Sequence, residues 1–472
     1  MNPPTEKNTY INRDQMGGMG QNISFGRNWL VVFLRKLKSS FIHQPVMQLV
    51  YAATILSKKH EILVIDALNE GSNANEVIKR VTEFNPEFTI MSISSSEIAF
   101  EKKMGMEIKK LGSKVITVGD TIPNKIELFD NSFDISVEGE IEPIVEEIIQ
   151  GNVEKIPGIL YFKNNKVKRN TKRNFMTPEE LDNIPFPKWE LFPYKKYRYY
   201  PLLLKEPIVS MLSSRGCPFG CYYCSYSRNE GKILRNRSAE NVVSEMLSLK
   251  KIGIKGIIFR DPLFTGDIER TKKICEKLIE NKSELVWGCE TRPELVNNET
   301  LNLMKKAGCR AINFGIESIN EKELSAVGRK KINPEYLKNI LKYAKQIEIN
   351  TTGFFILGLP EATKKSMNET INFSRNVGLS FAEYKVATPY PGTKLYELAI
   401  KNKWIKSDKW GGYEATMQID KDITPDYLNS LCEKSFRDFY YDPKWIMWQL
   451  QNDFFGKTKM LAKSSIRTLV NK

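Results

Sequence analysis

The stretch SSRGCPFGCYYCSYS, residues 213–227, places three cysteines at positions 217, 221 and 224. The next cysteine along the chain is Cys275, and both histidines of the chain precede the triad. A structural zinc site needs four ligands, so this triad lacks a fourth partner nearby. Three thiolates can instead bind three irons of a [4Fe–4S] cluster and leave the fourth iron open to a ligand. The spacing therefore predicts a catalytic cluster.

The composition, with 472 residues, 41% hydrophobic and 27% charged, is typical of a soluble globular protein with several domains. No apolar run reaches the roughly 18–20 residues that span a bilayer, and the first residues lack the apolar core of a signal peptide. Three clustered cysteines among seven favour a reducing cytoplasm over a disulfide framework. The net charge of +15 fits nucleic acid, an anionic membrane or an anionic substrate, or merely reflects a lysine-rich composition.

Strand and helix patterns alternate between residues 47 and 150, which indicates a parallel sheet with helices on both faces. The strand-like segments are EILVIDAL (61–68), FTIMSISSS (88–96), KVITVGD (114–120) and FDISVEGE (133–140). We therefore predict an α/β fold that begins with a doubly wound parallel sheet in residues 1–164. Ligands of such sheets bind beyond the carboxyl ends of the strands.

The rest of the chain divides into three segments. Residues 165–205 are basic and then rich in proline and aromatic residues, which predicts a linker. Residues 206–400 contain six strand–helix units and predict a partial, TIM-like (β/α)6 barrel. The cysteine triad follows the first strand of this barrel and therefore lies at its catalytic mouth. Residues 401–472 predict a helical C-terminal extension.

The motif CPFGCYYC resembles the signature of radical S-adenosylmethionine enzymes. The resemblance implies that Cys217, Cys221 and Cys224 bind a [4Fe–4S] cluster whose fourth iron chelates S-adenosylmethionine. An electron from the cluster would then split the sulfonium and release a 5′-deoxyadenosyl radical that abstracts hydrogen. Tyr223 stands where the backbone of the family contacts adenine.

Further motifs of residues 206–400 are similar to this family. CETRPE implies that Glu290 and Arg292 lie near the methionine part of the cofactor, and FGIES implies that Glu317 and Ser318 contact its ribose or sulfonium. GIIFRDPLF resembles the motif of the second strand, with Asp261 and a proline in place of the usual paired acids. The alternatives are a satisfied internal carboxylate for Glu317 and a surface ion pair for Arg292.

The N-terminal segment resembles the cobalamin-binding domain that precedes one class of these enzymes, through SISSS, TVGD and SVEGEIEP. The resemblance implies seven residues that contact cobalamin: Ser94, Ser95, Ser96, Gly119, Asp120, Glu138 and Gly139. The chain lacks the Asp-x-His-x-x-Gly motif that supplies a histidine ligand to cobalt, so cobalamin would bind without that lower ligand. The alternative is a doubly wound domain that binds no ligand and only packs on the barrel.

The start of the chain departs from the family, whose members have an apolar strand before the NPP stretch. Here Met1 directly precedes Asn2. We expect either that translation starts upstream or that WLVVFL (29–34) supplies the missing strand.

The resemblance implies a class B radical S-adenosylmethionine methyltransferase, similar to enzymes that act on hopanoids, tetraether lipids or tetrapyrroles. The predicted reaction is cobalamin-dependent methylation of an unactivated carbon on a lipid-like or other hydrophobic small molecule, with flavodoxin or ferredoxin as external electron donor. The first alternative is radical cyclisation or carbon–carbon coupling of a lipid or tetrapyrrole without methyl transfer. The second is a tRNA-modifying enzyme that uses the basic stretch KVKRNTKRNF (166–175), and nucleic acid is the less favoured partner. A third is a cluster that serves only structure or electron transfer.

The C-terminal stretch mixes aromatic and basic residues, which predicts peripheral contact with an anionic membrane at its inner face. Its residues are Trp445, Trp448, Phe454, Phe455, Lys457, Lys459 and Lys463. The alternative is an ordinary helix that packs on the barrel.

Overall fold

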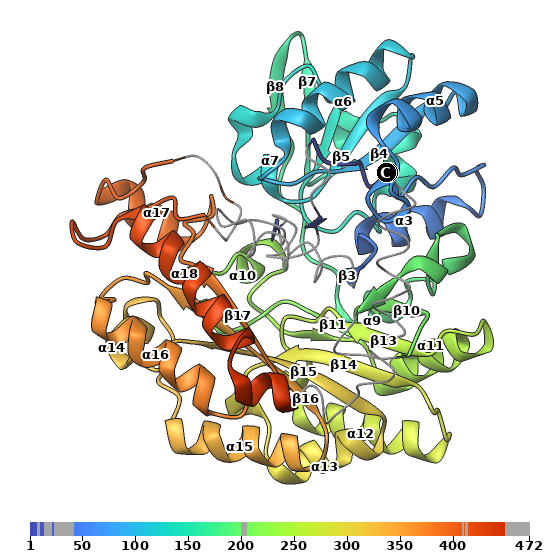
Figure 1. The fold of residues 1–472 in the computed structure, drawn as a ribbon. Coiled ribbons are helices and arrows are strands. Elements are labelled where there is room, and N and C mark those ends of the chain that lie inside the picture. The colour runs from blue at the N-terminus through green and yellow to red at the C-terminus, as the bar shows by residue number, and fades with distance from the viewer. Residues whose placement is uncertain are drawn as a thin grey trace.

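The computed structural model describes residues 1–6, 10–13, 21–22, 42–199, 205–407, 410 and 414–448. Two larger sheets organise these residues, a five-stranded first sheet and a six-stranded second sheet (Figure 1). The chain is thus an α/β protein with parallel strands in both sheets, as the sequence predicted. The predicted domain boundaries remain predictions.

The first sheet has the strand order β4-β5-β6-β7-β8. Its strands are β4 (Phe88–Ser92), β5 (Lys114–Val118), β6 (Ile135–Val137), β7 (Ile159–Lys163) and β8 (Lys166–Arg169). Only β4, β5 and β6 pair in parallel, so the prediction of a wholly parallel sheet is wrong for its other half. Asn164 and Asn165, both with positive φ, turn β7 directly into β8, which places β8 in the sheet and not in a linker.

Helices cover both faces of this sheet because alternate strand residues point to opposite sides. On one face, α3 (Met47–Leu56) and α8 (Val145–Ile149) pack against Ile116 and Val118 of β5. On the other face, α5 (Ala74–Phe84) and α6 (Ile98–Lys110) pack against Val115. The first sheet therefore has the layered arrangement that the alternating pattern predicts.

The predicted strand at 61–68 does not form, apart from an isolated bridge between Asn2 and Asp66. Met1 and Asn2 lie between this segment and β4, since Asn2 N donates to Ile65 O at 2.9 Å and Ser92 N donates to Met1 O at 3.1 Å. A cavity of about 310 Å³, lined by apolar side chains of both segments, lies alongside. A ladder needs a partner along its whole length, and among the described residues this segment is bonded on that side only to Asn2. The stretch WLVVFL lies outside the described residues.

The second sheet consists of six parallel strands in consecutive order. They are β10 (Ile208–Met211), β13 (Gly256–Phe259), β14 (Val286–Thr291), β15 (Cys309–Glu317), β16 (Asn350–Leu357) and β17 (Phe381–Val386). The main connecting helices are α11 (Ala239–Lys251), α12 (Ile268–Glu280), α13 (Asn298–Lys306), α15 (Pro334–Gln346) and α16 (Lys364–Asn376). Because all six strands run the same way, their carboxyl ends meet at one edge.

The C-terminal part contains α17 (Lys394–Lys401) and α18 (Pro425–Tyr440), which runs along β17 (Figure 1). A further helical turn at 443–448 carries Trp445, whose indole N–H donates to Ser380 O at 2.7 Å. Its ring packs edge-on against Tyr440 at 4.9 Å between centroids. Trp445 therefore behaves as the alternative expected, a packing residue, while residues 449–472 lie outside the described part of the chain.

Membrane contact of the C-terminal stretch remains a prediction. Among the helices that the structure describes, none combines the length and the apolar character needed to cross a bilayer.

We predict that Trp445→Ala lowers the free energy of unfolding by about 2–3 kcal/mol, less than for a fully buried tryptophan, because the ring is half-buried. Urea denaturation measures this change. Ile446→Ala is the matched control, because that side chain is 40% exposed and its loss should change stability by less than about 0.5 kcal/mol. Equal effects of the two substitutions would contradict the packing role of Trp445.

Candidate functional site

The three cysteines lie in a loop that is closed at its base by a very short ladder. β11 (Ser214–Arg215) pairs antiparallel with β12 (Arg235–Asn236), so residues 216–234 form the loop between them. The loop follows β10 and contains the short helix α10 (Tyr226–Asn229), which lies between the two sheets in Figure 1. The triad is therefore at the carboxyl edge of the second sheet, as the sequence predicted.

Backbone contacts fix the path of this loop. Cys217 N donates to Gly231 O at 3.0 Å, and Tyr222 N donates to Val327 O at 2.9 Å. Gly216 has φ +84°, and a Cβ at this position would collide with the backbone oxygen of Ile233. Only glycine fits there, so the residue before the first cysteine is determined by the turn itself.

All three thiols are free, partly buried, and line one cavity of about 180 Å³. Burial raises the pKa of the Cys217 thiol and of the Cys224 thiol, because the thiolate loses its hydration. The thiolates of a cluster carry no protons, so metal binding would release the protons from these thiols. In the described residues no three His, Cys, Asp or Glu side chains converge on a point that could hold a single ion. The triad fits a cubane, in which each thiolate binds a different iron.

Four of the five residues predicted for S-adenosylmethionine line the same cavity. These are Tyr223, Glu290, Arg292 and Glu317. Ser318 does not line it, because its hydroxyl lies against Thr370 Oγ1 at 3.3 Å and accepts from Asn320 N at 3.0 Å. Ser318 thus orders the start of α14 (Glu321–Ala326), and its predicted contact with the cofactor has no support in its position.

The charged residues of the cavity occur in pairs. Arg329 Nη1 lies 3.4 Å from Glu317 Oε1 and donates to Tyr223 OH at 3.3 Å. Burial raises the pKa of Glu317, and the Arg329 guanidinium opposes this shift. Glu290 accepts from Arg260 Nη1 at 2.8 Å. Glu317 therefore lines the cavity and also has a charged partner in the cavity wall, the guanidinium of Arg329.

Arg292 has features of both roles considered from the sequence, a surface ion pair and a place near the cofactor. Its Nε donates to Glu294 Oε1 at 2.6 Å, as in a surface ion pair, but the residue is only 7% exposed. Its guanidinium lies 3.8 Å from the ring centroid of Phe219, which belongs to the cysteine loop. Arg292 therefore connects β14 to the loop that carries the thiols.

The aspartate of the second-strand motif orders the approach to the loop. Asp261 is fully buried and accepts from Ser213 N at 2.7 Å and from Ser214 Oγ at 2.8 Å. This single acid thus binds the residue before β11 and the first residue of β11, three positions before the first cysteine of the triad.

Sequence reasoning missed several residues of the cavity wall. Asn313 on β15, Lys385 on β17, Arg329 and Tyr390 all line it. A signal existed for Asn313 and Lys385, since a polar residue inside an otherwise apolar parallel strand is unusual. Arg329 follows a short helix and carries no such signal.

The carboxyl edge of the first sheet carries the residues predicted for cobalamin, but several use their polar groups internally. Ser94 donates from N and Oγ to Glu101, and Ser95 Oγ donates to Trp410 O at 2.9 Å. Glu138 pairs with Arg169 at 2.7 Å, and Gly139 N donates to Asp120 Oδ1 at 3.3 Å. Gly119, the remaining glycine of the set, has φ +103°.

Three buried hydroxyl oxygens at this edge have no partner among the described residues. They belong to Ser96, Thr121 and Ser136, which lie on or directly after β4, β5 and β6. Unpaired buried hydroxyls are costly, so this edge has unused capacity for a polar ligand. The cavity at Asp120 and Gly139 measures about 20 Å³. A corrin ring needs far more room than the described residues leave at that point.

The edges of the two sheets face each other. Asn124, after β5, donates from Nδ2 to Asn229 Oδ1 of the cysteine loop at 3.1 Å. Lys125 Nζ lies 4.3 Å from the ring centroid of Trp410, which follows the second sheet in the chain. Ligands bound at the two edges would therefore be neighbours.

Comparison with known proteins gives a family match and named relatives. Residues 211–374 match the model of the Radical SAM superfamily, which confirms the predicted enzyme class. An uncharacterized methyltransferase of Pyrococcus horikoshii is 29% identical over 440 residues, covering 90% of this chain and 93% of the relative. The cytidylyl-2-hydroxyethylphosphonate methyltransferase of Streptomyces wedmorensis is 28% identical over 244 residues, 49% of this chain and 45% of that protein.

Solved structures share the fold over most of the chain. The radical S-adenosylmethionine methyltransferase TsrM from Kitasatospora setae, solved with cobalamin and a [4Fe–4S] cluster, has a TM-score of 0.65 at 18% identity and covers 86% of this chain and 84% of its own. The cobalamin-dependent S-adenosylmethionine radical enzyme OxsB, solved with aqua-cobalamin and S-adenosylmethionine, has a TM-score of 0.57 at 18% identity, with 87% and 55% covered. At 18% identity this likeness shows a shared fold.

We predict that Asp120 makes stability fall as the pH rises. Burial raises the pKa of Asp120 to about 8, so the folded protein keeps a proton that the unfolded chain releases near its ordinary pKa. Between those two values each rise in pH favours the unfolded chain. Asp120→Asn removes this titration, and urea denaturation between about pH 5 and pH 8 should show a smaller pH dependence than in the wild type. Parallel curves would contradict a protonated Asp120.

Proposed function

We propose that this chain, which is a radical S-adenosylmethionine enzyme of the methyltransferase-like kind, carries out cobalamin-dependent methylation of an unactivated carbon of a small molecule. The observation that carries the proposal is the shared cavity. Three cluster-type thiols and four polar residues suited to S-adenosylmethionine line it together, beside the edge suited to cobalamin.

The residues divide the task by position. When bound, the cluster with S-adenosylmethionine supplies the radical that removes hydrogen, and cobalamin supplies the methyl group. Cys217, Cys221 and Cys224 would hold the cluster, and the Glu317–Arg329 pair with Tyr223 would form a wall for the nucleotide. Arg292, stacked on Phe219, fixes the position of the loop relative to β14. Most of the protein's contribution is therefore orientation.

The cavity wall also supports a substrate with a large apolar portion. Leu263, Phe354, Phe355, Ile356 and Val386 line it. Among them lies Asn313, which donates to Tyr199 OH at 2.9 Å but whose Oδ1 has no hydrogen-bond partner in the described part of the chain. We infer that the substrate is a mainly apolar molecule with one polar group that binds Asn313. This description is narrower than the lipid-like substrate predicted from the sequence.

The proposed cobalamin site uses the unpaired hydroxyls of the first sheet. Because the cavity at Asp120 and Gly139 is too small for a corrin ring, binding would require this edge to open. Ser96, Thr121 and Ser136 would then supply donors and acceptors for the polar periphery of the cofactor, and the positive φ of Gly119 and Gly139 shapes the edge. Among the described residues that line the cavity at Asp120 and Gly139 there is no histidine, and the chain lacks the Asp-x-His-x-x-Gly motif, so cobalt would have no lower ligand from that motif.

A second candidate reaction is radical cyclisation. The anaerobic magnesium-protoporphyrin IX monomethyl ester cyclase of Rubrivivax gelatinosus is 24% identical over 411 residues, 83% of this chain and 73% of that protein. Such a reaction would use the same cavity and the same cofactors. It would differ in which carbon forms a bond with the substrate radical.

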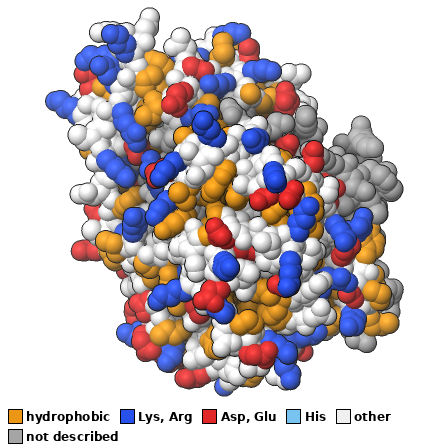
Figure 2. Space-filling view, turned by 90° about the vertical axis from the view of Figure 1, so that its left-hand side faces the viewer, with side chains coloured by type: hydrophobic (Ala, Val, Ile, Leu, Met, Phe, Trp, Pro, Cys, Tyr) orange, Lys and Arg blue, Asp and Glu red, His pale blue; other side chains and the backbone are white. Residues whose placement is uncertain are grey.

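RNA modification is not favoured. On the face shown in Figure 2, lysine and arginine side chains are interspersed with acidic ones and do not form a continuous basic stripe. A protein that neutralises many phosphates needs such a stripe. A small acidic electron donor of the flavodoxin or ferredoxin type remains the proposed partner.

We predict that Cys217→Ala, Cys221→Ala and Cys224→Ala each lose the cluster and abolish 5′-deoxyadenosine formation, because each removes the thiolate of one iron. Iron content and chromatography of the product from S-adenosylmethionine and dithionite measure this. Cys275→Ala, a buried cysteine of α12 outside the cavity, should keep both. A triad variant that cleaves S-adenosylmethionine at the wild-type rate would refute the assignment.

We predict that Thr121→Val weakens cobalamin binding by roughly 5–30-fold, because it removes one hydrogen-bonding group and keeps the shape. The hydroxyl has no partner in the described residues, so the melting temperature should not fall. Titration of hydroxocobalamin, followed by absorbance, measures the affinity. Thr117→Val is the control: its Oγ1 donates to Ile135 O at 3.4 Å within the sheet, so it should affect stability and not affinity.

The substrate itself is tested in cells. The protein is reconstituted anaerobically with S-adenosylmethionine and cobalamin and incubated with extracts of a deletion strain, whose lipids and pigments are analysed by mass. We expect one species that gains 14 mass units in the presence of the enzyme, as a methyl group replaces a hydrogen. A loss of two hydrogens without added carbon would favour cyclisation.

A further inference from the structure

We propose that Glu140 is a positioning residue that keeps the base of the cysteine loop closed, so that the first sheet determines the geometry of the cluster site. The proposal rests on the proposed function of the triad.

The base of the loop contains an unfavourable pair. In the two-residue ladder of β11 and β12, Arg215 lies directly opposite Arg235. Like charges directly opposite each other destabilise an antiparallel pair. Both arginines are only 6% exposed, so water screens them little. Without a negative charge beside the two arginines, this ladder would tend to open.

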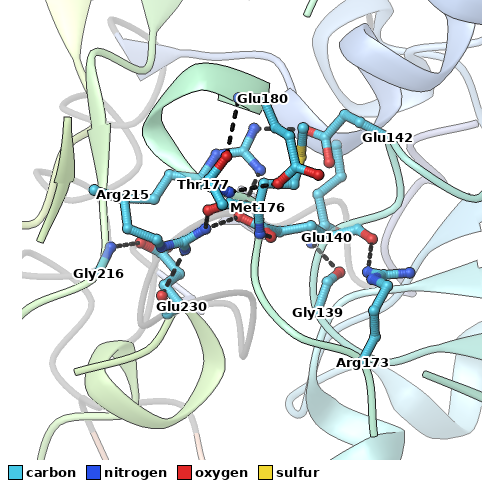
Figure 3. A network of polar contacts seen from close by, with 12 residues as sticks. Gly139, Glu140, Glu142, Arg173, Met176, Thr177, Glu180, Arg215, Gly216 and Glu230 are labelled. Atoms are coloured by element: carbon cyan, nitrogen blue, oxygen red, sulfur yellow. Dashed lines mark hydrogen bonds and ion pairs between the residues drawn. The ribbon is translucent and has the colours of Figure 1, made fainter. Parts of the chain in front are cut away.

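Glu140 offsets this repulsion from the other sheet. Its Oε1 accepts from Arg215 Nη1 at 3.1 Å and from Arg235 Nη1 at 2.7 Å, so that the two guanidinium groups share one carboxylate oxygen. Figure 3 shows Glu140 beside Arg215. Its Oε2 accepts from Met176 N at 2.8 Å, and its backbone oxygen accepts from Arg173. Glu140 is itself 5% exposed and held on all sides.

No other carboxylate in the described residues substitutes for Glu140 at Arg235. Glu142 pairs with Arg215 alone, at 2.5 Å. Arg235 also contacts the backbone oxygens of Met176 and Glu230, both at 2.7 Å, and its guanidinium lies 4.9 Å from the centroid of the Phe175 ring. Without Glu140, Arg235 would keep its charge in a buried place with no carboxylate hydrogen-bonded to it among the described residues.

The base connects to the thiols within a few residues. Glu230, whose backbone oxygen binds Arg235, also accepts from Gly216 N through its carboxylate at 3.3 Å. The next residue, Gly231, accepts from Cys217 N at 3.0 Å. A shift of β12 therefore moves the backbone partner of the first cysteine. On the other side, Gly139 ties the same segment to Asp120 at the edge of the first sheet.

The experiment compares Glu140→Gln with the wild type, both as reconstituted holoenzymes. Hydrogen exchange followed by mass spectrometry should show amides of 216–234 exchanging roughly tenfold faster in the variant, because the ladder opens locally. Electron paramagnetic resonance of the reduced cluster should show a broadened or weakened response to added S-adenosylmethionine. A residue that only contributed to global stability would leave that response intact.

The matched control is Glu101→Gln. Glu101 is a fully buried carboxylate of the same part of the chain, paired with Arg13 at 3.0 Å, and it does not contact the base of the loop. It should lower overall stability and leave both the exchange of 216–234 and the resonance of the cluster as in the wild type.

A second variant makes the test independent of whether Glu140→Gln folds. Arg235→Met removes one of the two facing charges, so adding Glu140→Gln in that background should accelerate exchange by less than about threefold. Wild-type exchange in Glu140→Gln, or an equal effect of the substitution in both backgrounds, overturns the proposal. If the wild type holds no cubane, the proposed function fails, while the exchange data still decide the role of Glu140.

Discussion

A carboxylate placed between two facing arginines is the constraint on which the cluster site depends. Arg215 and Arg235 close the loop of the three thiols, and Glu140 reaches them from the first sheet. Such a buried set of charges is a poor source of net stability, because desolvation offsets most of the attraction. Its value lies in geometry: the two sheets must be correctly docked for the charges to be satisfied, and the loop takes its shape from that docking.

Docking also explains why two separate edges form one site. Parallel strands of each sheet end on one side, and contacts such as Asn124 with Asn229 bring the two edges together. The cavity with the thiols is lined by paired charges, whereas the first edge offers unpaired hydroxyls. The first arrangement suits a charged nucleotide beside a cluster, and the second suits a large polar ligand. The fold thus separates two kinds of binding chemistry within one cleft.

Several expectations from the sequence were right because they depend on local patterns. The six consecutive parallel strands agree with the structure. The triad and four of the five residues predicted for S-adenosylmethionine line one cavity, while their roles stay predictions. Those that were wrong depended on distant partners. Segment 61–68 is apolar enough for a strand but has a partner only at Met1 and Asn2. Ser318 and Trp445 also meet distant partners, Thr370 and the backbone of Ser380, but their predicted contacts with the cofactor and with a membrane stay predictions.

The sequence alone determined the chemistry of the triad, since the spacing of three cysteines and the glycine before them are local properties of one loop. It also determined the order of strands and helices, because hydrophobic periodicity is read along the chain. Only the tertiary structure decided which charges meet. The partners of Arg235, Glu317 and Asp261 lie 95, 12 and 48 positions away. No local pattern records such pairs, because they form only when the helices and sheets have packed.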